Sequence, residues 1–197
     1  MKVMAFTDWH ASLSAFAEAK EKAKDVDLII CTGDFTIFQN QEKMLLRLMN
    51  NMGKPVLLVP GNHEDEIGLR DACIGLKNII YLHAASYQIG EYVFFGYGGG
   101  GFSYEDKGFE KTVKILKKEL PKKYKLVLLT HQPPHNTKLD LVLDSHVGSK
   151  SYRRFIDEEE PIAAISGHIH ECFGAVDKIK NCKLYNPGPK GRVIELN

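Results

Sequence analysis

Short apolar runs alternate with amphipathic stretches in the first third of the chain. Three of the runs predict buried strands, at residues 3–7, 27–34 and 55–62. Between them, residues 12–24 carry apolar side chains at helical spacing, and a second helix is expected to begin near Asn40 and to stop at Gly53. This β-α-β-α-β order predicts a parallel sheet with right-handed crossovers.

The pattern changes in the middle of the chain. Residues 79–98 are typical of two strands joined near Gly90, which predicts an antiparallel hairpin. The elements expected after it are a lysine-rich helix ending at Leu120, a strand at 125–131, a helix over 152–159, a strand within 162–170, and two short strands across a Pro/Gly turn in 183–197. With no internal repeat and no linker, we expect one mixed α/β domain over residues 1–197.

Composition narrows the class of protein. The 197 residues suffice for one sizeable core, and 26 basic against 25 acidic residues leave a net charge of +1. Attraction to nucleic acid or to anionic lipid is therefore not indicated. No apolar run approaches the ~20 residues of a membrane span, and the N-terminal stretch lacks a signal-peptide core. The four cysteines show no C-x-x-C spacing, which favours reduced core thiols and a cytoplasmic location.

Side chains that can bind a metal follow five of the predicted strands. They are Asp8 and His10, then Asp34, then Asn62 and His63, then His131, and finally His168 and His170. Open α/β sheets build their sites at this carboxyl end of the strands. The spacing of two in Asp8/His10 and His168/His170 would let an extended backbone point both side chains the same way. The glycines before Asp34, Asn62 and His168 would let the backbone turn tightly beside the site.

The ordered set D-x-H, GD, GNH[ED], H and GHxH resembles the calcineurin-like metallophosphoesterase family, in particular its small prokaryotic phosphoesterases. The match runs from Asp8 to His170, which is most of the chain. The resemblance implies an α/β fold, a single-domain αββα sandwich of two mixed β-sheets flanked by helices, with a dinuclear metal centre at the carboxyl ends of the strands. It assigns Asp8, His10 and His170 to the first metal, Asn62, His131 and His168 to the second, and Asp34 to both. His63 would be the catalytic histidine, although it could instead orient a metal ligand.

The residue types suit phosphoester hydrolysis. Two divalent cations carry four positive charges, and Asp8 and Asp34 return only two negative ones, so a phosphate ester would be attracted. A bridging carboxylate lets the cations lie ~3.5–4 Å apart, and a hydroxide bridging them would be the nucleophile. Mixed imidazole, carboxylate and amide ligands favour transition metals, with Mn expected and Fe, Ni, Co or Zn as alternatives.

The expected function is therefore a metal-dependent phosphoesterase that hydrolyses a phosphodiester or a small nucleotide. The alternative is a non-enzymatic metal-binding or protein-interaction scaffold of the same fold, which the complete ligand set disfavours. A DNA-processing nuclease is less favoured, because the chain has neither the length nor the basic surplus. The partner expected is a small phosphoester substrate, without membrane or nucleic acid, and a homo-oligomer stays open.

Several neighbouring residues receive other expectations. Trp9 is expected in the core, and Glu64 and Asp65 as acids at a helix N-terminus. His135 and His146 lie on the loop after His131, where substrate contacts are common, although neither is expected to line the pocket. Arg153 and Arg154 are expected as surface charges. The glycine-rich run at residues 96–102 predicts a turn beside the pocket.

Overall fold

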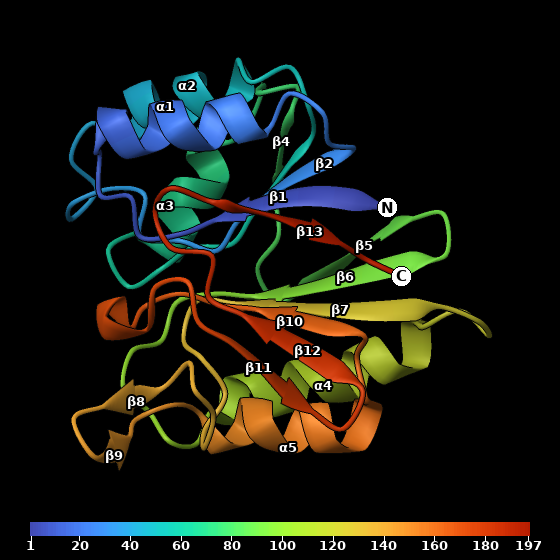
Figure 1. Ribbon diagram of the computed structural model, residues 1–197. Helices are drawn as coiled ribbons and strands as arrows, with labels where there is room; N and C mark the ends of the chain where they lie inside the picture. Colours follow the sequence, from blue (N-terminus) through green and yellow to red (C-terminus); the bar gives the residue numbers. More distant parts are fainter.

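Two β-sheets packed face to face form the centre of the molecule, and helices cover the outer face of each sheet (Figure 1). The computed structural model describes all residues, 1–197. The chain is thus an α/β protein with four layers, in the order helices, sheet, sheet, helices. This is the αββα arrangement expected from the sequence.

The first sheet has five strands in the order β13-β1-β2-β3-β4. Strands β1 to β4 run parallel, and β13 pairs antiparallel with β1. The strands are β1 (Lys2–Phe6), β2 (Leu28–Cys31), β3 (Val56–Leu58), β4 (Ile79–Tyr81) and β13 (Arg192–Glu195). The helices over its outer face are α1 (Leu13–Lys22), α2 (Glu42–Asn50) and α3 (Glu66–Ala72).

The second sheet has six strands in the order β11-β12-β10-β7-β6-β5. Its four inner strands are parallel, and the two edge strands β11 and β5 are antiparallel to their neighbours. The strands are β5 (Ala85–Ile89), β6 (Tyr92–Tyr97), β7 (Lys125–Thr130), β10 (Ala163–Ile165), β11 (Val176–Ile179) and β12 (Cys182–Tyr185). Helices α4 (Lys107–Glu119) and α5 (Lys150–Glu159) cover it (Figure 1).

The alternation of side chains along the strands builds three separate apolar layers. In β1, Val3 and Ala5 face the second sheet, whereas Met4 and Phe6 face the helices. The same period of two in β7 sends Leu129 inward to the sheet-sheet layer and Leu128 outward to the α4 and α5 side. Strands buried on both faces must be apolar throughout, which is why these runs carry no polar alternation.

Polar side chains fix where the helices begin. The hydroxyl of Ser12 accepts a hydrogen bond from the N–H of Ala15 at the start of α1, and Ser149 does the same for Tyr152 in α5. Carboxylates cap two more, with Asp65 at α3 and Asp106 at α4, whereas α2 has no side-chain cap. Such caps satisfy backbone N–H groups that have no partner within the helix.

The structure corrects several element boundaries. Helix α2 begins at Glu42 rather than near Asn40, because Gln39 and Gln41 have φ values of 64° and 58°, outside the helical region. Residues 79–98 hold three strands, since Ile79–Tyr81 is β4 of the first sheet and only β5 and β6 form the expected hairpin. The two tail strands, β12 and β13, lie in different sheets. Helix α3 follows the expected helix N-terminus at Asp65, whereas strand β11 was not expected.

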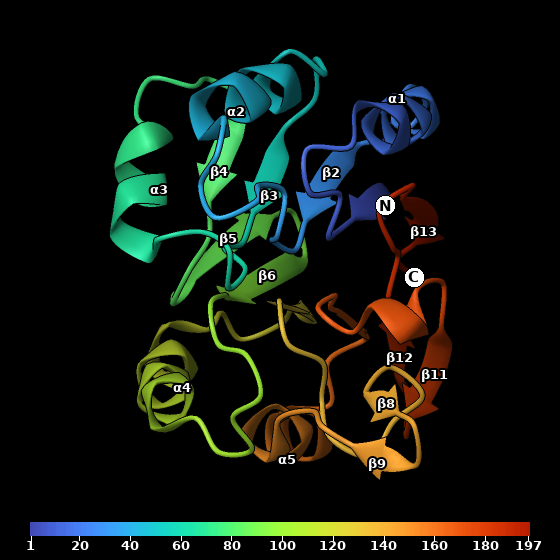
Figure 2. The same ribbon diagram turned by 90° about the vertical axis from the view of Figure 1, so that its left-hand side faces the viewer.

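Two further elements lie near the carboxyl ends of the strands, the side that faces the viewer in Figure 2. They are the short antiparallel pair β8 (Leu141–Val142) and β9 (Ser145–His146), and the 3₁₀ turn η1 (His170–Cys172). All four cysteines are free and buried, as expected, and Trp9 is fully buried. None of the helices combines the length and the apolar character that crossing a lipid bilayer requires.

Candidate metal centre

The predicted site residues lie on loops that leave the strands at one edge of both sheets (Figure 2). The loops after β1, β2 and β3 belong to the first sheet, and those after β7 and β10 belong to the second. The first sheet supplies Asp8, His10, Asp34, Asn62 and His63, and the second supplies His131, His168 and His170. The two sheets therefore share the site between them.

The backbone at the site is turned, not extended. Asp8 and His10 have φ values of 51° and 42°, Asp34 has 50° and His168 has 69°. The expectation that an extended strand aims each D-x-H or H-x-H pair was therefore wrong, because β1 ends at Phe6 and β10 at Ile165. Left-handed φ values are unfavourable for residues other than glycine, and such strain gathers at functional sites.

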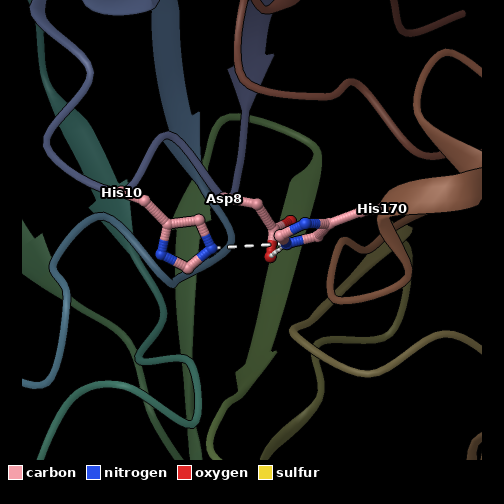
Figure 3. Close-up of side chains that lie close together, drawn as sticks. All are labelled: Asp8, His10 and His170. Carbon is pink, nitrogen blue, oxygen red and sulfur yellow. Dashed lines mark hydrogen bonds and ion pairs between the residues drawn. The ribbon is translucent and has the colours of Figure 1, made fainter.

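The first group of candidate ligands is Asp8, His10 and His170 (Figure 3). Nε2 of His10 lies 3.3 Å from Nε2 of His170, and that nitrogen lies 3.6 Å from Oδ1 of Asp8. The Asp8 carboxylate is held by the hydroxyl of Thr7 at 2.7 Å and by the N–H of His168 at 3.0 Å. Asp8 thereby ties the loop after β1 to the loop after β10.

The second group is Asp34, His131 and His168. Nε2 of His131 lies 3.3 Å from Oδ2 of Asp34 and 3.0 Å from Oδ1 of Asn62, so Asn62 belongs beside this group. Asp34 is also grouped with His10 and His63. It is the carboxylate that lies within reach of both sides of the centre.

Hydrogen bonds to the far ring nitrogens determine what each histidine presents to the site. Nδ1 of His10 donates to the carbonyl of Thr36 at 2.9 Å, and Nδ1 of His131 donates to that of Thr32 at 2.8 Å. Both rings therefore turn Nε2 towards the centre, and this nitrogen can bind a metal ion once it carries no proton. In His63, Nδ1 instead accepts from the N–H of Phe38 at 3.2 Å, so the neutral ring carries its proton on Nε2.

Three observations test whether these residues fit a metal ion. Nε2 of His168 is buried without any hydrogen-bond partner, which is costly for a polar atom unless another group binds it. The lone pair of His131 points at the oxygens of Asn62 and Asp34, an arrangement that is repulsive unless a cation or a proton lies between them. The 3.3 Å between the His10 and His170 nitrogens suits two ligands with metal–nitrogen bonds of about 2.1 Å. The donor set fits divalent cations.

The charges of the centre follow from its burial. Burial raises the pKa of Asp34, but the hydrogen bond and charge of His131 outweigh it and lower the pKa to about 2. Burial lowers the pKa of His131, but Asp34 raises it to about 9. For His168, burial and the charge of His131 act together and lower the pKa to about 4. Asp34 is therefore ionised and His168 is neutral, which are the states that bind metals.

Comparison with known proteins agrees with this geometry. The sequence profile of the calcineurin-like phosphoesterases matches residues 1–172. The chain belongs to the calcineurin-like phosphoesterase family. It is therefore a phosphoester hydrolase that depends on divalent metal ions.

Individual relatives cover nearly the whole length of this phosphoesterase. The protein MJ1162 of Methanocaldococcus jannaschii is 31% identical over 209 residues, which cover 98% of this chain and 91% of the relative. The crystal structure of TT1561 from Thermus thermophilus has a TM-score of 0.76 at 16% identity. The match covers 100% of this chain and 99% of the TT1561 chain. The phosphopantetheinyl hydrolase of Mycobacterium tuberculosis has a TM-score of 0.66 at 15% identity, with coverages of 95% and 88%. These structures share the fold.

The sequence interpretation missed the role of Glu64 in this phosphoesterase. Asp65 caps α3 as expected, but Glu64 is only 6% exposed and lies outside the helix. Its carboxylate accepts hydrogen bonds from the N–H groups of Asp34 at 2.8 Å, Gly61 at 2.9 Å and Thr36 at 3.0 Å. Burial and the charge of Asp34 raise its pKa. The expectation that Glu64 acts on a helix dipole was wrong. The sequence did carry a signal for this, because Asp65 is a strong N-cap residue and its position places Glu64 before the helix.

Two glycines of the family motifs are required for close approach. A Cβ atom at position 61 would lie 2.0 Å from Oδ1 of Asp34, and one at position 167 would lie 2.3 Å from Oδ2 of Asp8. Both distances are shorter than any side-chain contact can be. Gly61 and Gly167 therefore let the two carboxylates of the centre lie directly against the neighbouring backbone.

The remaining candidates lie outside the metal groups. Nδ1 of His146 lies 2.8 Å from the buried carboxylate of Asp140, and the ring of His135 packs beside His146. Arg153 pairs with Asp157, and Arg154 pairs with acidic residues of the α4 region.

The glycine-rich run does lie beside the centre. Gly99 and Gly100 line a hollow of about 350 Å³ together with Gly61, Asn62, Glu64, Asp65, Glu66 and Ile67.

Proposed function

We propose that this phosphoesterase hydrolyses a phosphodiester or a small nucleotide, and that two ions, Mn²⁺ in the cell, occupy the groups around Asp34. The observation that carries the proposal is the opposite orientation of neighbouring imidazoles. His10 and His131 donate through Nδ1 to backbone carbonyls and so turn Nε2 to the centre as a possible ligand, whereas His63 accepts at Nδ1 and presents an Nε2–H. A site that only stored metal would have no use for a hydrogen-bond donor beside its ligands.

Each residue has a definite task in the proposed reaction. Asp8, His10 and His170 would hold the first ion, Asn62, His131 and His168 would hold the second, and Asp34 would contribute to both. When bound, such a pair of divalent ions lowers the pKa of water and withdraws charge from a phosphoryl group. His63 lies with Nε2 3.8 Å from Oδ2 of Asp34, at the rim of the centre, and donates a hydrogen bond or a proton to the leaving oxygen.

The size of the protein supports small substrates. About half of the chain forms the two sheets and the five helices that cover them, and the rest connects these elements, so no separate domain is left to dock a phosphoprotein. A cytoplasmic location is also proposed, because the four cysteines are free and buried as in reducing compartments. Within the family, a non-enzymatic scaffold is disfavoured because every predicted ligand position carries a side chain that can bind metal.

Metal removal tests the reaction. Chelator-treated protein is expected to lose hydrolysis of bis(p-nitrophenyl) phosphate and to regain it when Mn²⁺ is added. The metal content is measured in each sample, and p-nitrophenyl phosphate is assayed in parallel to compare a monoester with the diester. Full activity in protein shown to be free of metal would exclude the mechanism, and faster monoester turnover would overturn the diester preference.

Replacing His63 tests its separate role. In His63→Ala we expect both metals to stay bound and turnover of an alkyl diester to fall ~10²- to 10⁴-fold, the usual cost of losing an acid–base group. A nitrophenyl ester has a good leaving group and should lose much less. His135→Ala is the matched control, since His135 lies outside the metal groups. Equal losses on both esters would assign His63 to charge stabilisation, and loss of metal would make it a ligand or a support for one.

A further inference from the structure

Three exposed phenylalanines surround the candidate centre, and each packs on one of its histidines. The ring centroid of Phe38 lies 4.3 Å from that of His63, Phe102 lies 4.7 Å from His168, and Phe173 lies 4.8 Å from His170. They come from three different loops, after β2, after β6 and after η1. We call Phe38, Phe102 and Phe173 the aromatic rim.

The aromatic rim does not serve the folded core. Phe38 is 75% exposed, Phe102 is 66% exposed and Phe173 is 37% exposed, and none belongs to an apolar core layer. Phe38 also has a φ of 47°, a conformation that costs about 1 kcal/mol or more for a residue with a side chain. An unfavourable backbone that exposes an apolar ring beside a reactive histidine is explained by binding and not by stability.

The surroundings of the rim restrict what it can bind. Arg153 and Arg154 are paired with carboxylates and are not free to bind further phosphates. The hollow beside Asn62 has no basic residue, and Ile67 is the one apolar side chain that lines it. Further phosphates would find no counter-charge there, and a long acyl chain would find no apolar channel. A flat, uncharged ring suits exposed phenylalanine faces best.

We propose that the aromatic rim binds a planar aromatic group, of the nucleobase type, on the ester that the centre hydrolyses. This inference rests on the proposed function and narrows it from a phosphodiester or small nucleotide to esters of a single phosphoryl group that carry such a base. The ring of the substrate packs on the faces of the phenylalanines that the histidines leave free, while its phosphoryl group lies at the centre.

Two diesters with the same leaving group test the proposal. Thymidine 5′-(p-nitrophenyl) phosphate and methyl p-nitrophenyl phosphate both release p-nitrophenolate, and they differ in that one carries a nucleoside where the other carries a methyl group. Stacking on one aromatic side chain changes base affinity ~5- to 150-fold. We therefore expect kcat/KM for the thymidine ester to exceed that for the methyl ester by at least about tenfold. Equal values for both esters would overturn the proposal.

Substitutions then distinguish ring stacking from other effects. Phe38→Leu and Phe102→Leu, which keep an apolar side chain, should lower the thymidine-to-methyl ratio, and Phe38→Tyr should keep it. Ile74→Ala, at another exposed apolar residue, is the control and should also keep the ratio. A ratio unchanged in the leucine variants, with both esters slowed equally, would mean that the phenylalanines only support the histidines, which would overturn the proposal.

A binding measurement separates this inference from the proposed function. Thymidine 5′-monophosphate and methyl phosphate are titrated into the Mn²⁺-loaded protein by calorimetry, which requires no turnover. Tighter binding of the nucleotide, weakened in Phe38→Leu, would support the rim even if neither ester were hydrolysed. Equal affinity of the two ligands would reject the rim, and active hydrolysis of both esters would then leave the phosphoesterase function standing.

Discussion

The carboxylate of Glu64 holds the loops after β2 and β3 together. One oxygen accepts from the N–H groups of Asp34 and Gly61, and the other accepts from the N–H and the hydroxyl of Thr36. Asp34 in turn accepts from the N–H of His63 at 2.9 Å. Residues that orient metal ligands in this way typically change metal affinity by 10- to 100-fold when replaced.

Glu64→Gln should therefore weaken metal retention by ~10- to 100-fold while the fold is kept. The amide must turn its NH₂ group towards backbone N–H donors, and leaving these donors unpaired costs about 1–3 kcal/mol of unfolding free energy. Metal analysis after dialysis and thermal unfolding measure the two effects. Glu66→Gln is the matched control, because Glu66 is half exposed and pairs with His83. Unchanged metal content in Glu64→Gln would show that Glu64 does not position the centre.

At the scale of elements, the sequence predicts strands that are buried on both faces and helices with a clear apolar side. Strands β1, β2, β3, β7 and β10 are continuous apolar runs, so their positions could be read directly. Helix α3 is only seven residues long, and β11 is an edge strand with mostly exposed residues. The hydrophobic patterns of these two elements are too short to show the extent of α3 or the existence of β11.

The candidate site could be located from the sequence because the candidate ligands follow five strands, each at its carboxyl end. The local geometry could not, since the left-handed φ values of Asp8, His10 and His168 are imposed by contacts between loops far apart in the chain. The N–H of His168, for example, bonds to Asp8, and that of His10 bonds to the carbonyl of Asp34. Glu64 was missed for the same reason, since three of its four donors belong to the loop after β2.

At the scale of the whole molecule, the centre joins the two sheets. Asp8, His10, Asp34 and Asn62 come from the five-stranded sheet, whereas His131, His168 and His170 come from the six-stranded sheet. A ligand that binds only the native state stabilises it by an amount that grows with its concentration. Metal binding should therefore stabilise the packing of one sheet on the other.

Mn²⁺ at about 100 times its Kd should raise Tm by roughly 5–10 °C, since such binding contributes about 2.7 kcal/mol in a chain of this size. In Asp34→Asn we expect most of this shift to vanish, because the residue assigned to both ions loses its charge. Asp157→Asn, which removes a surface partner of Arg153, is the control and should keep the shift. A full metal-dependent shift in Asp34→Asn would show that Asp34 does not bridge the ions. Thermal unfolding with and without chelator measures both variants.

The pairing of β13 with β1 has a consequence for biosynthesis. Lys2 lies opposite Glu195, so β1 must wait during synthesis until β13, far later in the chain, can cover its outer edge. Strands β1 to β4 can associate earlier, because each follows the previous one through a local crossover. During that interval β1 offers a row of free N–H and C=O groups to any other nascent chain. Intermediates in which β13 has not yet paired therefore expose the edge of β1, and this unpaired edge favours aggregation.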